Sequence, residues 1–509
     1  MAKPAEKLAT SLEVLHVLQE QGVVAIRSSQ LTRTHRERLV KNGFLKEVMK
    51  GWYTPSRPDE AGGESTAWYA SFWNFCAAYL ESRFEDQWSL SPEQSLAIHA
   101  ENWSVPGQLL VRTERGDNKP VTLPHDTSLF ILRATLPEPA QRATNQGLRL
   151  FSIPAALIAA GPAAFRQRPT DMRIALAMIQ DASEVLALLL EGGHSKVAGR
   201  LAGAFRNIGN EKVADQIVKA MRAADFKVQE EDPFETAAIY QPPPRERSPY
   251  VNRMRLMWQD MREQIAGRFP EPPGLPVDAR KYLKHIDDVY VTDAYHSLSI
   301  EGYRVSPELI ERVRSGDWNP DTDEIDRERR DALAARGYWQ AHQKVRETVS
   351  RIIGGENPGA AVDADHSDWY QELFGPSVTA GLLKPADLAG YRNDQVYIRN
   401  SLHVPPRVRA VREYMPVFFD LLRDETDPAV RVILGHFVFV YIHPYMDGNG
   451  RMGRFLMNAM LAGGGYLWTI IPVDRRQDYL QTLEQASVNQ NILPFTDFLA
   501  GLIEHDPTE

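Results

Sequence analysis

The sequence predicts a multidomain protein with a small N-terminal domain of helices and a hairpin, an α/β middle body and a mostly helical C-terminal domain. The chain has 509 residues, which is long enough for several domains. Apolar residues recur at helical spacing through most of the C-terminal half. Residues 229–250 are acidic and then proline-rich, which is typical of an extended linker between domains.

The composition is that of an ordinary globular protein, with 43% hydrophobic and 25% charged residues. The single cysteine, Cys76, cannot form an internal disulfide, so the chain has no need of an oxidising compartment. The N-terminus lacks the apolar core of a signal peptide, and no run approaches 18 uninterrupted apolar residues. We therefore expect a cytoplasmic protein without a membrane partner.

Residues 1–56 are predicted to form two helices, at 11–22 and within THRERLVKNGFL, followed by a hairpin that turns at Lys50-Gly51. This order resembles a winged helix-turn-helix. The segment has nine Lys or Arg against five Asp or Glu, whereas the whole chain has a net charge of −9. Such residues would contact the phosphates of double-stranded DNA, although many winged helices bind proteins instead. The candidate DNA-binding residues are Arg33, Arg36, Arg38, Lys41, Lys46 and Lys50.

Residues 57–228 are predicted to form an α/β body. Short β-type runs occur at 108–112, 128–133 and 148–151, and helical patterns follow. The segment from about residue 10 to 225 resembles AbiEi-type antitoxin regulators in its basic helix, its GWYTP hairpin and its SPEQSLAIH and WSVPGQLLV stretches. That resemblance implies a DNA-binding head joined to an α/β body. No nucleotide or metal motif is evident in the body.

The stretch YIHPYMDGNGRMGRF, residues 441–455, concentrates the chemistry of the chain. Asp427-Pro428 predicts the start of a helix, which is apolar nearly all round and should end at His443-Pro444. We predict a loop over residues 445–450 and a second helix from about residue 451 to 461.

Each part of this stretch has a chemical role. The glycines of Gly-Asn-Gly allow backbone N–H groups to form an anion-binding nest at the start of a helix. Arg451 and Arg454 are three residues apart on that helix and suit phosphate. Asp447 is an oxygen ligand of the kind that Mg²⁺ prefers when it also holds phosphates, and His443 suits base chemistry. The pattern predicts transfer of a phosphate-containing group to a nucleophile that His443 deprotonates.

The string HPYMDGNGRMGR resembles the signature of Fic-domain proteins, with Tyr445 in place of the usual phenylalanine. The resemblance implies an all-α Fic domain over residues 251–509, with a small β-hairpin flap. It implies an adenylyltransferase that moves AMP from Mg·ATP to a Ser, Thr or Tyr hydroxyl of a target protein or of itself. By this resemblance, His443 would be the catalytic base and Asp447 the Mg²⁺ ligand. The implied nucleotide-binding residues are Gly448, Asn449, Gly450, Arg451 and Arg454.

Two other segments resemble features of the same family. Ser297, Glu301 and Gly302, at the end of a helix over about 277–302, resemble its inhibitory motif, in which the glutamate pairs with the second arginine, here Arg454. The stretch DLAGYRNDQVYIRNSLHVPPRVRAV resembles the flap that aligns a target by strand addition. The implied flap residues are Gln395, Val396, Tyr397 and Ile398.

Three hypotheses about function stay open. The first is an adenylyltransferase restrained by Glu301. The second is a DNA-binding transcriptional regulator of a toxin–antitoxin-like module, with the Fic domain as a sensor. In the third, Glu301 orients water to remove AMP from a modified protein. The sequence is also compatible with an oligomer. Residues 354–370, GGENPGAAVDADHSDWY, are predicted to form a polar insertion.

Overall fold

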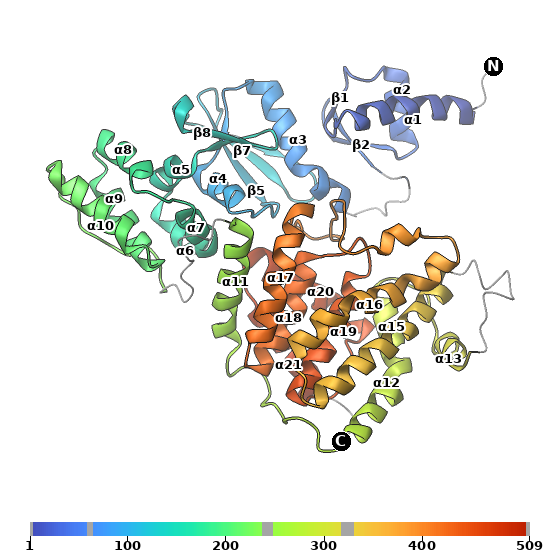
Figure 1. Cartoon of the computed structure of the whole chain (residues 1–509). Helices are drawn as coiled ribbons and strands as arrows, with labels where there is room; N and C mark the ends of the chain where they lie inside the picture. Colours follow the sequence, from blue (N-terminus) through green and yellow to red (C-terminus); the bar gives the residue numbers. More distant parts are fainter. Residues whose placement is uncertain (1–3, 57, 59–64, 237–247, 317–329, 505–509) are drawn as a thin grey trace. The chain divides into compact units, whose positions relative to one another are not determined.

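The computed structural model of the chain is shown in Figure 1. It describes residues 4–56, 58, 65–236, 248–316 and 330–504. The chain forms two compact units. The first unit comprises the chain up to Arg253 together with Tyr397–Val404, and the second comprises Met254–Val396 and Pro405–Glu509. The domain boundaries predicted from the sequence stay predictions. Residues 237–247 of the predicted linker lie outside the described residues.

The N-terminal part of the first unit has the predicted second helix and hairpin. Its three strands form an antiparallel sheet in the order β1-β3-β2, and Gly51 adopts φ +82° in the turn between β2 and β3. The winged-helix assignment stays a prediction. The elements are α1 (Pro4–Glu20), β1 (Ile26–Arg27), α2 (Arg33–Lys41), β2 (Leu45–Met49) and β3 (Trp52–Pro55).

The rest of the first unit combines a four-stranded sheet, in the order β4-β5-β7-β6, with a β8–β9 hairpin and helices. β5 and β7 are parallel, and the other pairs are antiparallel. The three predicted β-type runs become β5, β7 and β9, and Cys76 is fully buried on α3. The strands are β4 (Ser89–Leu90), β5 (Gln108–Thr113), β6 (Pro120–Thr122), β7 (Ser128–Arg133), β8 (Arg142–Asn145) and β9 (Leu148–Phe151). The helices are α3 (Thr66–Phe84), α4 (Pro92–His99), α5 (Ile153–Ala159), α6 (Pro162–Gln167), α7 (Pro169–Ala177), α8 (Ser183–Glu191), α9 (Ser195–Asn207) and α10 (Glu211–Ala223).

The second unit has helices and no β-strand among its described residues. α18 packs against α19, and α15 packs against α16 and α19, so these helices lie side by side in Figure 1. α11 (Pro249–Ile265) begins before the division at Arg253 and continues into this unit. The other helices are α12 (Ala279–Ile300), α13 (Pro307–Ser315), α15 (Arg330–Ile353), α16 (Pro358–Thr379), α17 (Val408–Asp424), α18 (Pro428–Ile442), α19 (Asn449–Gly464), α20 (Arg476–Asn489) and α21 (Leu493–Glu504).

α18 begins and ends where the sequence predicts. The Asp427 carboxylate accepts hydrogen bonds from the N–H groups of Ala429 and Val430, at 2.9 and 3.3 Å, and so caps the helix. Nearly every side chain of α18 is buried, as expected for a helix that is apolar all round. The helix therefore fixes the position of His443, the residue directly after it.

The flap is not a β-hairpin, so that prediction is wrong. Residues 395–398 form no strand ladder. The return segment contains Pro405 and Pro406, which have no N–H to donate, and the Gln395 side chain instead donates to the Pro405 carbonyl at 2.9 Å. Tyr397–Val404 belongs to the first unit, where Val105 N–H donates to the Leu402 carbonyl at 2.8 Å.

The polar insertion predicted over residues 354–370 is also wrong, because most of it forms the long helix α16. Asn357 caps this helix by accepting from Ala360 N–H at 3.0 Å, and Pro358 occupies the first position. Trp369 and Tyr370 are buried, so tertiary packing outweighs the polar composition. Among the residues that the structure describes, we find no helix with the length and apolar character to cross a membrane.

Candidate active site

His443 occupies the end of α18 in a left-handed conformation, φ 53° and ψ 61°, which few non-glycine residues adopt. Its backbone N–H donates to the Phe439 carbonyl at 3.0 Å. The ring Nδ1 lies 3.2 Å from the Val440 carbonyl, an acceptor, so Nδ1 carries the proton and Nε2 keeps a lone pair. Burial, together with the positive charge of Arg392, lowers the pKa of His443 to about 4. The imidazole is therefore neutral near pH 7 and able to accept a proton.

Arg392 anchors the backbone around His443. It is 1% exposed, its Nε donates to the His443 carbonyl at 2.8 Å, and its own N–H donates to the Pro444 carbonyl at 2.8 Å. The sequence analysis missed this residue, because nothing in its local pattern distinguishes it from other arginines. Arg392 joins the start of the predicted flap segment to the loop that contains the imidazole.

The loop after His443 is closed by the side chain of Asn449, which is 1% exposed. Its Oδ1 accepts from Tyr445 N–H at 2.9 Å, and its Nδ2 donates to the Tyr445 carbonyl at 2.8 Å. Tyr445 stacks on Tyr370 with ring centroids 3.8 Å apart, so tyrosine fits the position of the usual phenylalanine. The Asn449 side chain thus shapes the loop, and only its backbone N–H is left for the predicted role in nucleotide binding.

α19 begins at Asn449, two residues earlier than predicted, and ends at Gly464, three residues later. Gly448 precedes it with φ +79°, and a Cβ there would lie 2.7 Å from the Phe374 ring, so only glycine fits. The first N–H groups of a helix have no intrahelical partner, and the helix dipole gives this end a partial positive charge. Gly450 and Arg451 lie in this first turn, which is a ready anion site.

Asp447 lies beside this helix start with its side chain 63% exposed. It accepts from Gly448 N–H at 2.6 Å, and its other oxygen is 3.8 Å from Arg451 Nη2. Within the described ranges, no three His, Cys, Asp or Glu side chains gather as a metal site. A single exposed carboxylate fits Mg²⁺, which binds one or two carboxylates while substrate phosphates and water supply its other ligands.

Arg454 is buried and donates hydrogen bonds to residues at the end of α12. Its Nε donates to Ser297 Oγ at 2.8 Å, and its Nη2 donates to the Ser297 carbonyl at 3.0 Å and to Glu301 Oε1 at 2.7 Å. The Arg454 side chain is 5% exposed and that of Glu301 is 30% exposed. The structure therefore brings together the three predicted residues of this contact.

The Glu301 carboxylate also lies directly over the start of α19, because a Cβ added at Gly450 would collide with Glu301 Oε1. Burial alone would raise the pKa of Glu301, but the charges of Arg454 and Arg451 outweigh it and lower the pKa. The carboxylate is thus ionised at neutral pH. Gly302 ends α12 with φ +87°, which allows the chain to turn away after Glu301.

Arg451 is buried without a comparable partner. It is 1% exposed, and its Nε has no hydrogen-bond partner among the described residues. Its guanidinium carbon lies 5.2 Å from the Tyr303 ring centroid and 5.0 Å from that of Phe374. The sequence analysis did not predict either ring as part of the site.

The six basic residues predicted to bind DNA differ in their solvent exposure and in their hydrogen bonds to the rest of the chain. Arg36 donates to the Ser28 carbonyl at 3.1 Å, and Arg38 donates to Ser11 Oγ at 2.8 Å, so both hold the N-terminal fold together. The other four are exposed, although Arg33 pairs with Glu37 at 2.6 Å. The exposed residues are Arg33, Lys41, Lys46 and Lys50.

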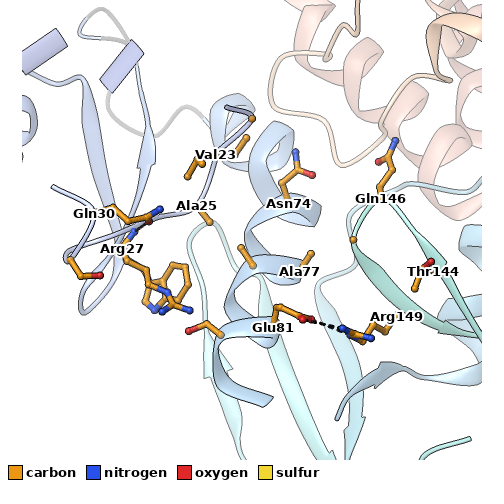
Figure 2. Close-up of a pocket in the computed structure, with 17 residues that line it drawn as sticks. Val23, Ala25, Arg27, Gln30, Asn74, Ala77, Glu81, Thr144, Gln146 and Arg149 are labelled. Atoms are coloured by element: carbon orange, nitrogen blue, oxygen red, sulfur yellow. Dashed lines mark hydrogen bonds and ion pairs between the residues drawn. The ribbon is translucent and has the colours of Figure 1, made fainter. Parts of the chain in front are cut away.

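The first unit contains a cavity of about 800 Å³ between residues 22–30, α3 and the β8–β9 hairpin (Figure 2). Arg27 lies over the Trp52 ring at 5.1 Å, and across the cavity Arg149 pairs with Glu81 at 2.9 Å. None of the residues that the sequence predicts as functional lines this cavity. The size of this cavity alone does not indicate a reaction. The α18–α19 joint, by which we mean residues 443–454, combines a base, a helix N-terminus and buried cations.

Comparison with known proteins points to the same part of the chain. Residues 366–461 match the Fic/DOC family model, and this range includes α18, the loop and most of α19. The chain is 27% identical over 256 residues to "Protein adenylyltransferase Fic" of Nematostella vectensis, covering 50% of this chain and 56% of that protein. It is 35% identical over 265 residues to the protein of the same name from Drosophila yakuba, covering 50% of this chain and 47% of that protein.

Among solved structures, the chain is similar to Fic-1 (residues 134–508) from C. elegans, with 20% identity and a TM-score of 0.37, over 62% of this chain and 89% of that one. We draw no argument from a similarity of that size. The chain spans about half the length of the curated relatives that it matches most extensively. What the comparisons establish is the match of residues 366–461 to the Fic/DOC family.

Proposed function

We propose that the chain is a protein adenylyltransferase that transfers AMP from ATP to a Ser, Thr or Tyr hydroxyl of a target protein, with the chain itself among the candidate targets. The observation that carries this proposal is the α18–α19 joint, where the loop over residues 444–448 connects a neutral His443, whose Nε2 keeps its lone pair, to a helix N-terminus with two buried arginines. The adenylyltransferase names of the relatives support it.

In the proposed reaction, the target hydroxyl gives its proton to His443 Nε2 while its oxygen bonds to the α-phosphorus of ATP. The bond from the α-phosphorus to its bridging oxygen breaks, and pyrophosphate leaves. The first-turn N–H groups of α19 and the Arg451 guanidinium hold the phosphates. Mg²⁺, bound through Asp447 and the phosphates, would offset phosphate charge. Arg392 and the Nδ1 hydrogen bond orient the imidazole.

We infer that Glu301 restrains this reaction within the chain. A hundredfold restraint needs about 2.7 kcal/mol, whereas an exposed ion pair contributes ~0–1 kcal/mol. The pair with Arg454 is partly buried, and the Glu301 carboxylate stands over Gly450, where it would repel a bound phosphate. Occupation of Arg454 and charge repulsion therefore act together. The same carboxylate would also be needed if the enzyme removes AMP from a modified protein.

The test uses the full-length Glu301→Gly variant with a cell lysate and Mg·ATP labelled on either the α- or the γ-phosphate. AMP transfer labels protein from α-labelled ATP and not from γ-labelled ATP. Label from the γ-phosphate alone would show a kinase and contradict the proposal. Release of AMP from modified protein by the wild type, but not by Glu301→Gly, would favour the reverse reaction.

A second candidate function is binding of double-stranded DNA by residues 33–50. The observation that favours it is that four of the six predicted basic residues are exposed on α2, β2 and the turn after it. Such binding would weaken steeply with salt, because neutralised phosphates release counterions. A lack of binding to duplex DNA at low salt would remove this candidate.

A further inference from the structure

The inference concerns Arg451 and rests on the proposed nucleotide-binding role of the α18–α19 joint. Two arginines lie three residues apart at the start of α19, and both are buried. Arg454 donates from Nε and Nη2 to Ser297 and Glu301. Arg451 has an unpartnered Nε, and the Asp447 carboxylate at 3.8 Å is beyond hydrogen-bonding distance. A buried cation with an unpartnered donor needs another source of stabilisation.

Two aromatic rings provide that stabilisation. The guanidinium carbon of Arg451 lies 5.2 Å from the Tyr303 ring centroid and 5.0 Å from that of Phe374, both within the range of cation–π attraction. A ring attracts the cation without using its N–H groups, whereas a carboxylate would occupy them and cancel the charge. The aromatic contacts thus occupy none of the Arg451 N–H groups, and its Nε is left to donate to an anion.

Tyr303 is placed by the way that α12 ends. Gly302 adopts φ +87° and donates to the Ser299 carbonyl at 3.0 Å, and Tyr303 N–H reaches back to the Leu298 carbonyl at 3.1 Å. These bonds form a Schellman-type termination, which fixes the direction of the residue after the glycine. The same helix end that places Glu301 against Arg454 therefore places Tyr303 against Arg451.

Phe374 comes from α16 and is 6% exposed. Its ring packs so closely on Gly448 that a Cβ there would lie 2.7 Å from it. Tyr370, one turn earlier, stacks on Tyr445 at 3.8 Å, so α16 supports both the loop and the ring beside Arg451. Gly448 is thus needed for its positive φ and for the approach of Phe374 to the guanidinium.

We propose that Tyr303 and Phe374 are positioning residues that hold the Arg451 guanidinium between them with its donors free for the phosphates of the nucleotide. Neither ring takes part in the transfer itself. Their effect is on nucleotide affinity: the rings keep the cation preorganised, so less ordering is needed when the nucleotide binds.

The test uses the full-length chain in the Glu301→Gly background and compares Tyr303→Leu with Tyr303→Phe. The matched control is Tyr295→Leu, at a half-buried tyrosine of α12. We measure Mg·ATP affinity by calorimetry, KM and kcat for AMP transfer, and thermal unfolding. Tyr303→Leu should raise Kd and KM for ATP about tenfold, the size of a partly desolvated cation–π contact, with little change in kcat. Tyr303→Phe, which keeps the ring, should match the parent.

A double-mutant cycle separates positioning from general support of the fold. If Tyr303 acts through Arg451, Tyr303→Leu should have no further effect on ATP affinity once Arg451→Ala is present. Unchanged ATP affinity in Tyr303→Leu, or an equal loss with and without Arg451, would overturn the proposal. If the Glu301→Gly parent transfers no AMP but Tyr303→Leu still weakens ATP binding, the proposed function fails and the positioning role stands.

Discussion

Two groups of basic residues in this chain are predicted to bind phosphates, and their surroundings differ sharply. Arg451 and Arg454 on α19 are 1% and 4% exposed, and each is held by specific neighbours. Lys46, near the start of β2, and Lys50, in the turn between β2 and β3, are exposed to solvent. A buried cation is costly unless something compensates for it, so its presence calls for a functional or structural reason. An exposed lysine needs none, and its functional assignment depends on experiment.

The largest effect should come from His443→Ala, which removes the proposed base at the end of α18. AMP transfer by the Glu301→Gly parent should fall by at least about 10²–10⁴, because general base catalysis is lost. Affinity for Mg·ATP should change little, since the phosphates contact α19. Equal loss of ATP binding would mean that His443 supports the loop and is not specifically the base. Transfer and calorimetry in parallel distinguish these outcomes.

Glu301→Gly tests whether the contact between Glu301 and Arg454 restrains AMP transfer. We expect AMP transfer to rise about ten- to a hundredfold, which corresponds to about 1.4–2.7 kcal/mol. Glu311→Gly, at an exposed glutamate on the next helix, α13, is the matched control and should leave transfer unchanged. Transfer that is no faster in Glu301→Gly than in the wild type would show that this contact is structural only.

The pH dependence of kcat/KM reports the pKa of His443 in the free enzyme. Burial lowers that pKa to about 4, so the base is already deprotonated at about pH 6 and activity should be flat from there to about pH 8. Glu301 raises the pKa of His443, so the Glu301→Gly variant should lose activity only at still lower pH. A fall in kcat/KM centred near the ordinary histidine value of about 6.5 would contradict this account.

The smallest and least specific effect is expected from the exposed basic group. Lys46→Glu/Lys50→Glu should weaken binding to duplex DNA roughly equally for all sequences and reduce the salt slope by about one for each lost phosphate contact. Lys212→Glu/Lys219→Glu on α10 is the charge-matched control. Equal effects of the two double variants would mean that only the overall charge matters and that residues 33–50 form no specific site.

Local patterns predicted the α18–α19 joint well. The cap at Asp427 and the end of α18 at His443-Pro444 follow from short-range chemistry, and both are present in the structure. The contact of Glu301 with Arg454 is also present, but it was expected only from the resemblance to Fic-domain proteins. The start of α19 was placed too late, because Asn449 looks like a loop residue in sequence. Its side chain bonds back to Tyr445, which lets the helix begin there.

The parts that the sequence did not predict depend on residues far apart in the chain. Tyr303 and Phe374 meet Arg451 only through the packing of α12, α16 and α19, and no local pattern marks either ring. Arg392 reaches His443 across 51 positions. The flap failed as a hairpin because two prolines on the return segment cannot donate to a ladder. The ring contacts and the Arg392 contact depend on tertiary packing, and the structure of the flap depends on the N–H groups that proline lacks. Local propensity predicts neither.

The most direct test of the central claim is a crystal structure of full-length Glu301→Gly with Mg²⁺ and a non-hydrolysable ATP analogue. The account predicts that the phosphates lie at the N-terminus of α19 within hydrogen-bonding distance of Arg451, with the α-phosphate facing His443 Nε2. A nucleotide bound elsewhere, or phosphates directed away from the α19 N–H groups and the imidazole, would contradict it.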